Sequence, residues 1–156
     1  MSERDDVRKD ALKMLERKDY TERKLRDKLI KKEFSQSVID DAMRWLKQKK
    51  FIDDRRFAEN LVFFKHKKGY GKRRIMRDLF LRGVDEDIAQ NALGRIDFDE
   101  QVKKAEEILQ KKEKMVKTKQ KALLKKKLLQ YLSQRGFEWE VVQEVWKRRE
   151  EKDEIL

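Results

Sequence analysis

The feature that most constrains the fold is a set of six apolar positions that occurs three times along the chain. The set returns 50 places after its first occurrence and again after 53 more places, and every position stays apolar. Its members are Leu25, Leu29, Phe34, Val38, Ala42 and Met43, then Ile75, Leu79, Val84, Ile88, Ala92 and Leu93, then Leu128, Leu132, Phe137, Val141, Val145 and Trp146. The spacing within each set fits two helix faces joined by a turn. The pattern therefore predicts equivalent helical units repeated along the chain.

A further apolar pair precedes each set and predicts a first helix for each unit. These pairs are Leu12 and Leu15, Ala58 and Leu61, and Ala105 and Ile108. The chain has no proline and only five glycines among 156 residues, which favours helices. With 47% charged and 38% apolar residues, each unit buries too little to be stable alone and must stack on its neighbours. We therefore predict an all-α fold, an elongated tandem array of three three-helix repeat units over residues 1–50, 51–97 and 98–156.

Several short polar side chains stand where these helices should begin. Thr21, Ser35 or Ser37, and the pair Asp53–Asp54 can accept hydrogen bonds from the free amides that open a helix. Residues 100–134 contain no glycine or proline and could form one unbroken helix, but the repeat predicts a break near Thr118. The three tryptophans, Trp45, Trp139 and Trp146, are predicted to lie in the core, because aromatics at helical spacing usually pack.

The formal net charge is +12, and it is unevenly distributed. Residues 65–82 hold a net +7 and residues 111–135 a net +9, which leaves the remainder of the chain acidic at −4. Such basic segments attract polyanions: nucleic acid, an anionic membrane or an acidic protein. The chain has no cysteine, no apolar run long enough to span a membrane, and a charged amino terminus unlike a secretory signal. We therefore expect a cytoplasmic protein without a membrane partner.

No enzymatic, metal or cofactor site is predicted. His66 is the single histidine and has no thiol or second histidine to act with. Asp53–Asp54 could bind a divalent ion, but the start of a helix explains the pair without a ligand. Gly69-Tyr70-Gly71 lacks the spacing of the Walker and dinucleotide-binding loops.

The basic segments are the candidate binding sites, because Lys and Arg neutralise phosphates and release counterions. The first cluster is Lys65, Lys67, Lys68, Tyr70, Lys72, Arg73, Arg74, Arg77 and Arg82, and the secondary cluster is Lys117, Lys119, Lys121, Lys125, Lys126 and Lys127. We expect the strongest phosphate contacts at the start of the helix at 72–77, with Gly69 and Gly71 letting the backbone approach the ligand. Tyr70 is predicted to be exposed and, with Phe64, to stack on bases. The alternative is a solvated lysine coat with the aromatics in the core.

An ordered series of motifs resembles the RecX family of recombination regulators over about residues 7–96. Its residues are Tyr20-Thr21-Glu22, Leu25, Lys28-Leu29, Phe51-Ile52-Asp53-Asp54, Phe57-Ala58, Gly71, Arg74-Ile75, Leu79, Arg82-Gly83-Val84 and Ala92-Leu93. Glu33 departs from the family, which usually has a glycine there. Beyond residue 96 the resemblance rests on length and helical character.

This resemblance implies a regulator that binds the RecA recombinase filament on single-stranded DNA and typically lowers its ATPase and strand-exchange activity. It implies a role in DNA repair, recombination and the SOS response, with the protein lodged along the filament groove. We expect a monomer. Two alternatives remain open at this point: a general helical nucleic-acid-binding protein that acts without a recombinase, and a scaffold whose basic face docks an acidic protein.

Overall fold

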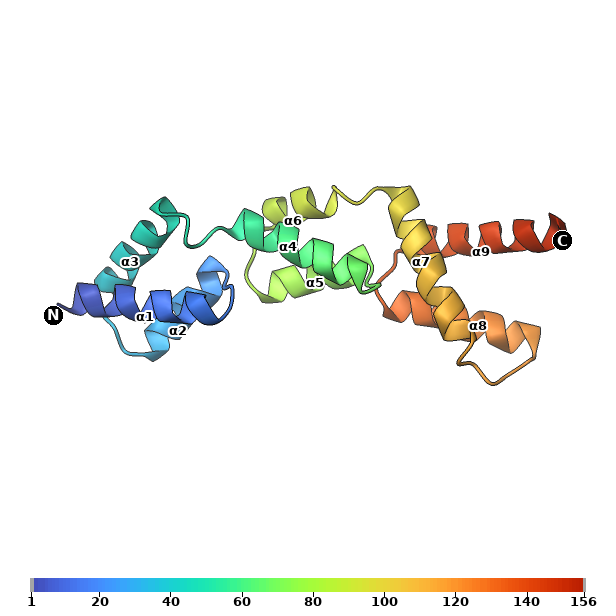
Figure 1. Ribbon diagram of the computed structural model, residues 1–156, viewed down its shortest axis with the longest axis horizontal. Helices are drawn as coiled ribbons and strands as arrows, with labels where there is room; N and C mark the ends of the chain where they lie inside the picture. The colour runs from blue at the N-terminus through green and yellow to red at the C-terminus, as the bar shows by residue number, and fades with distance from the viewer. Residues whose placement is uncertain (1, 156) are drawn as a thin grey trace. The chain divides into compact units, whose positions relative to one another are not determined.

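The computed structural model describes residues 2–155, with side chains up to Asp153. Within these residues the chain forms nine α-helices and no β-strand, which confirms the all-α prediction (Figure 1). The helices are α1 (Glu3–Arg17), α2 (Glu22–Lys31), α3 (Gln36–Gln48), α4 (Asp54–Lys67), α5 (Lys72–Leu81), α6 (Glu86–Leu93), α7 (Phe98–Glu113), α8 (Lys121–Gln134) and α9 (Trp139–Ile155). The gap between α7 and α8 confirms the predicted break near Thr118.

Two of the predicted helix starts use the expected side chains. The Thr21 hydroxyl accepts a hydrogen bond from the Lys24 amide at 3.2 Å, which caps α2. An Asp53 carboxylate oxygen accepts from the Arg55 and Arg56 amides at 3.1 and 3.2 Å, at the start of α4. Ser35 takes the cap position of α3, but its side chain makes no capping hydrogen bond.

The chain divides into two compact units, which are described separately. The amino-terminal unit comprises the residues up to Asn60 together with Leu79–Ala92, and the carboxy-terminal unit comprises Leu61–Asp78 together with the residues from Leu93 onward. In the first unit α1 and α2 pack on α3, and in the second α7 and α8 pack on α9. Each unit thus combines a terminal three-helix group with parts of α4 and α5, and the amino-terminal unit also holds α6 up to Ala92.

The apolar positions of the repeat form the core. All eighteen are buried except Phe34, Val38, Ile88 and Trp146, which are partly buried. Trp45 and Trp146 pack against the cores of the two units, as predicted. Trp139 is 58% exposed, so the prediction that it lies in the core is wrong. It is the first residue of α9 and precedes Val141, Val142 and Val145, with which the helix enters the core.

The turn after the second helix of each repeat has the same geometry. Glu33, Gly83 and Gly136 occupy equivalent positions and have φ angles of 65°, 80° and 95°. Their amides donate to the carbonyls of Ile30, Phe80 and Ser133, each at 3.0 Å. Glu33 therefore adopts the left-handed conformation that glycine adopts in the other two copies, despite the steric cost to a residue with a Cβ.

A second contact recurs between successive repeats. In the amino-terminal unit the Thr21 hydroxyl donates to the Arg82 carbonyl at 2.5 Å. In the carboxy-terminal unit the equivalent residue, Gly71, donates its amide to the carbonyl of Arg135 at 2.9 Å. Arg82 and Arg135 each precede a turn glycine. The start of one middle helix therefore bonds to the turn that follows the next middle helix, through a side chain in one case and the backbone in the other.

Candidate nucleic-acid interface

The end of α4 and the start of α5 bring most of the predicted basic cluster together in the carboxy-terminal unit. The connection holds Gly69, which has a φ of 90°, and Gly71. A Cβ on Gly69 would lie 2.5 Å from the Ile108 Cγ2 atom, and a Cβ on Gly71 would lie 2.4 Å from the Gly136 carbonyl and the Phe137 nitrogen. The chain itself fills the space beside both glycines. The prediction that they bring the backbone toward a ligand is therefore wrong.

The amides that open α5 are also partly occupied. Gly71 donates to the Arg135 carbonyl at 2.9 Å, and Arg73 donates its amide to the Gly136 carbonyl at 3.0 Å. An open helix start offers such amides to an anion. Here the turn between α8 and α9 takes two of them, so the protein itself occupies part of the expected phosphate site at the start of this helix.

The side chains of Arg73 and Arg74 contact other residues of the protein. Arg73 Nη2 donates to the Ser133 carbonyl at 2.8 Å and to the Ser133 hydroxyl at 3.3 Å. The Arg74 guanidinium lies 4.5 Å from the centroid of the Tyr70 ring, and its Cβ abuts Gly136. Both arginines hold α5 in place. Both are nevertheless exposed, as Arg77 is, whereas Lys72 is partly buried.

Tyr70 is half-buried and surrounded by cations. The Arg135 guanidinium lies 3.9 Å from the ring centroid, and Lys65 Nζ lies 5.2 Å from it on the same unit. Arg135 also donates to the Gly69 and Lys68 carbonyls at 3.1 and 2.6 Å, which satisfies the free end of α4. The predicted exposure of Tyr70 is wrong, because these cation–π contacts cover the ring.

Arg135 is a structural residue that sequence reasoning did not single out. It packs on Tyr70 and donates to the carbonyls at the end of α4. It lies 66 residues after Gly69 and 67 residues after Lys68 in the sequence. One signal was present: Arg82 and Arg135 hold the same place before a turn glycine in successive repeats.

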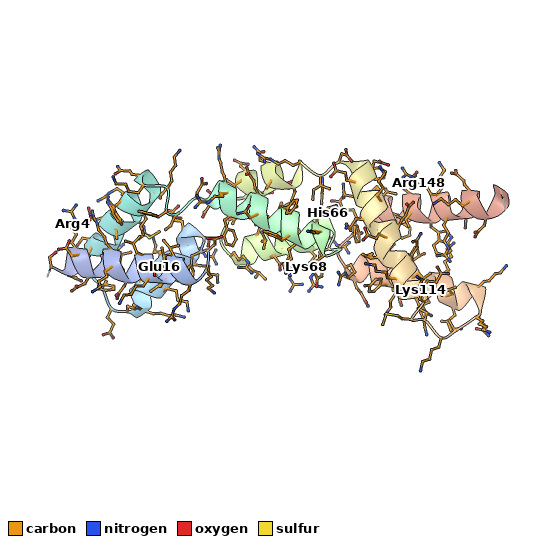
Figure 2. The ribbon with its side chains drawn as sticks, in the orientation of Figure 1. Arg4, Glu16, His66, Lys68, Lys114 and Arg148 are labelled. Atoms are coloured by element: carbon orange, nitrogen blue, oxygen red, sulfur yellow. The ribbon has the colours of Figure 1, made fainter. Side chains whose placement is uncertain are left out.

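Lys67 and Lys68 are exposed at the end of α4, as expected of binding residues, and Figure 2 labels Lys68 there. Lys65 instead pairs with Asp78 at 3.6 Å.

One turn before these lysines, two phenylalanine rings are open to solvent. Phe63 is 62% exposed and Phe64 is 57% exposed. The two rings pack edge to face, with their centroids 5.4 Å apart. Phe64 was expected on this surface. The exposure of Phe63 was not predicted from the sequence. It follows from the helical pattern, because Phe63 lies outside the buried helix face to which Val62 belongs.

The electrostatic field at this end of α4 is positive. Burial lowers the pKa of His66, and the charges of Lys104 and Lys72 lower it further, against a smaller opposite effect of Glu107. Lys104 Nζ donates to the Lys67 carbonyl at 3.4 Å and to Glu107 at 3.1 Å. The lowered pKa favours the neutral imidazole, so the positive charge of this site comes from its lysines.

The other predicted residues lie elsewhere. Arg82 belongs to the amino-terminal unit, where its guanidinium lies 5.6 Å from the Phe57 ring centroid. Lys117 and Lys119 lie in the connection between α7 and α8, and the remaining members of the secondary cluster, Lys121, Lys125, Lys126 and Lys127, lie on α8; all six are exposed. Lys125 covers Trp146, with Nζ 5.3 Å from the ring centroid. Among the described residues, no comparable pair of exposed aromatic rings lies beside the secondary cluster.

The described residues offer neither a metal site nor a membrane-spanning helix. None of their His, Asp and Glu side chains form a group of three that could hold a metal ion. None of their helices is long and apolar enough to cross a membrane. Asp54 has a structural partner, since its carboxylate accepts a hydrogen bond from the Glu22 amide at 2.9 Å.

Comparison with known proteins assigns the chain to a family. Three family models match it in order: the first three-helix domain of RecX over residues 8–46, the second over 53–93 and the third over 99–146. Similar proteins include the "Regulatory protein RecX" of Haemophilus influenzae, 38% identical over 125 residues, which are 80% of this chain and 82% of that protein. The RecX of Chlorobium limicola is 33% identical over 135 residues, 86% of this chain and 83% of that protein.

Two solved structures share the fold. The crystal structure of RecX from Lactobacillus salivarius superposes with a TM-score of 0.87 at 22% identity, and covers 94% of this chain and 96% of its own. A second structure, of "regulatory protein RecX", has a TM-score of 0.82 at 19% identity, over 93% of this chain and 72% of its own. The prediction of three three-helix units in tandem is confirmed by these matches. The chain therefore belongs to the RecX family of regulatory proteins.

Proposed function

We propose that this protein binds the RecA recombinase filament on single-stranded DNA and lowers its ATPase and strand-exchange activity. Family membership is the observation that supports this function, through matches to all three RecX domains. In this proposal it works in the cytoplasm as a monomer, in the control of DNA repair, recombination and the SOS response. It acts by binding, without catalysis of its own.

The mechanism follows from charge and repetition. The chain carries a net charge of +12, with exposed lysines at the end of α4 and along α8. Such a surface is attracted to the phosphates of a DNA-bound filament. The chain is built from three successive three-helix domains, which suits a partner built from repeated protomers. The protein lodges along the filament groove and bridges neighbouring protomers while its lysines approach the DNA.

The test is ATP hydrolysis by a RecA filament at fixed DNA and recombinase concentrations. A filament regulator lowers hydrolysis when it is substoichiometric to the recombinase, because one bound molecule affects several protomers. A protein that only competes for DNA lowers hydrolysis when there is enough of it to cover the DNA. An unchanged rate at all doses would exclude the proposed function. Inhibition only at covering doses would favour a general nucleic-acid-binding protein.

A further inference from the structure

One face of α4 combines two exposed aromatic rings with two exposed lysines. Phe63 and Phe64 each precede a lysine by four residues, Lys67 and Lys68. Residues four apart are neighbours on a helix surface, and the Lys68 amide still donates to the Phe64 carbonyl at 3.1 Å, so the helical geometry continues to Lys68. We call these four residues the aromatic–lysine face. More than half of each phenylalanine is open to solvent.

Two acidic residues of the same unit already have partners. Asp78 pairs with Lys65, at 3.6 Å, and Glu107 pairs with Lys104, at 3.1 Å. Two more cations, Lys104 and Arg135, bind the carbonyls of Lys67 and Lys68. The ammonium groups of Lys67 and Lys68 are therefore available for an anionic ligand, and the surrounding cations strengthen the attraction.

Trp139 provides a contrast within the same unit. It is 58% exposed, close to the 57% of Phe64, but Glu138 and Glu140 flank it in the sequence. Exposed apolar rings alone would fit many partners. A ring beside lysines fits a ligand with both aromatic surfaces and negative charge, and single-stranded nucleic acid has both in every nucleotide.

We propose that Phe63, Phe64, Lys67 and Lys68 form a contact surface for single-stranded DNA, in which bases stack on the two rings and phosphates pair with the two ammonium groups. This surface differs from the start of α5, where the turn between α8 and α9 occupies two of the amides. The inference rests on the proposed function only in taking single-stranded DNA as the ligand.

The experiment measures binding of the full chain to a fluorescent oligothymidylate and to an abasic oligonucleotide of equal length, without recombinase, at several salt concentrations. In the variant Phe63→Ala with Phe64→Ala, affinity for oligothymidylate should fall by roughly fivefold or more per ring. Affinity for the abasic strand should not change. The salt dependence should keep its slope, because no charge is removed.

In the variant Lys67→Ala with Lys68→Ala, the slope of log affinity against log salt should flatten by about 0.7 for each lost phosphate contact. This flattening should appear with both oligonucleotides. Trp139→Ala is the matched control, since it removes an aromatic residue of similar exposure beside carboxylates, and it should leave both affinities unchanged. Circular dichroism checks that each variant keeps its helix content.

Several outcomes would overturn this assignment. One is an unchanged affinity for oligothymidylate in the phenylalanine variant. Another is an equal loss of affinity for oligothymidylate and for the abasic strand in that variant. The last is an unchanged DNA affinity in that variant together with a loss of its inhibition of the filament. The last outcome would make the face a protein-docking surface. If the alanine variant loses helix, Phe63→Leu with Phe64→Leu keeps apolar volume without a ring and should show the same loss. Because these assays contain no recombinase, their failure is distinct from failure of the ATPase test.

Discussion

At residue 33 the chain has a glutamate where the two equivalent turns have glycine. Glu33 has a φ of 65° and makes the same hydrogen bond as Gly83 and Gly136. A side chain in this left-handed region costs roughly 1–2 kcal/mol, and glycine removes that cost while it adds some entropy to the unfolded chain. Glu33→Gly should therefore stabilise the protein by about 0.5–1 kcal/mol, measured by chemical denaturation.

The neighbouring residue supplies the control for this substitution. Lys32 is also exposed, but its φ is −83°, so glycine relieves no strain there. Lys32→Gly should destabilise slightly, because only the entropy term remains. A loss of stability in both variants would mean that the left-handed conformation at Glu33 is not strained.

A second residue-scale prediction concerns Asp54 and pH. Burial raises the pKa of this carboxyl above its ordinary value of 3.8, and the hydrogen bond from the Glu22 amide only partly offsets that rise. The folded state thus holds the proton more tightly than the unfolded state. This contribution to stability is fully present below pH 3.8 and is lost as the pH rises through the raised pKa.

Asp54→Asn keeps an oxygen that can accept from the Glu22 amide and removes the charge of a partly buried group. The variant should be more stable than the parent protein at pH 7, and the difference should shrink as the pH falls toward 4. Thermal unfolding at several pH values measures it. Asp87→Asn, on the exposed surface of α6, controls for the loss of one carboxylate. A difference that grows with acidity would contradict the prediction.

At the scale of helices and turns, the contact between α5 and the turn after α8 depends on a missing side chain. A Cβ at Gly71 would lie 2.4 Å from backbone atoms of Gly136 and Phe137, which cannot rotate away. Gly71→Ala should cost roughly 1–3 kcal/mol, as overpacking does, because α5 and the turn must separate. Denaturant unfolding followed by circular dichroism tests it.

Ser35→Ala is a comparably small change outside these contacts. Ser35 is exposed and its side chain makes no capping hydrogen bond, so this variant should lie within about 0.5 kcal/mol of the parent protein. Equal stability of Gly71→Ala and the parent would show that the two segments are not in direct backbone contact in solution.

For the whole molecule, the secondary lysine cluster supplies charge without an ordered site. Lys117, Lys119 and Lys121 are exposed in and beside the connection between α7 and α8. Charges of this kind accelerate encounter more than they prolong binding. Replacing the three with glutamine should slow association with single-stranded DNA at low salt by roughly two- to tenfold and leave dissociation almost unchanged.

Stopped-flow kinetics at two salt concentrations separates these rates. The Lys67→Ala and Lys68→Ala variant is the comparison, since loss of direct contacts should accelerate dissociation. If the glutamine variant dissociated as fast as the Lys67→Ala and Lys68→Ala variant, the connection between α7 and α8 would make a specific contact with DNA.

The amino-acid sequence by itself determined the helices, their repetition and the core. Leu25, Ile75 and Leu128 could be assigned to buried faces because helical periodicity is local, and a side chain's face depends on neighbours three and four residues away. The caps at Thr21 and Asp53 were predictable for the same reason. Lys67 and Lys68 were also correctly expected to be exposed, since unpaired lysines rarely lie inside a protein.

Only the tertiary structure decided which basic and aromatic residues remain available to a ligand. Arg73 bonds to Ser133, Tyr70 is covered by Arg135, and Gly71 is packed against Gly136, although 60 or more residues separate each pair. Periodicity within one helix contains no information about such partners. The physical reason is that a helix end presents the same free amides and charged side chains whether solvent, a ligand or a distant turn satisfies them, and only packing of the distant segments selects among these.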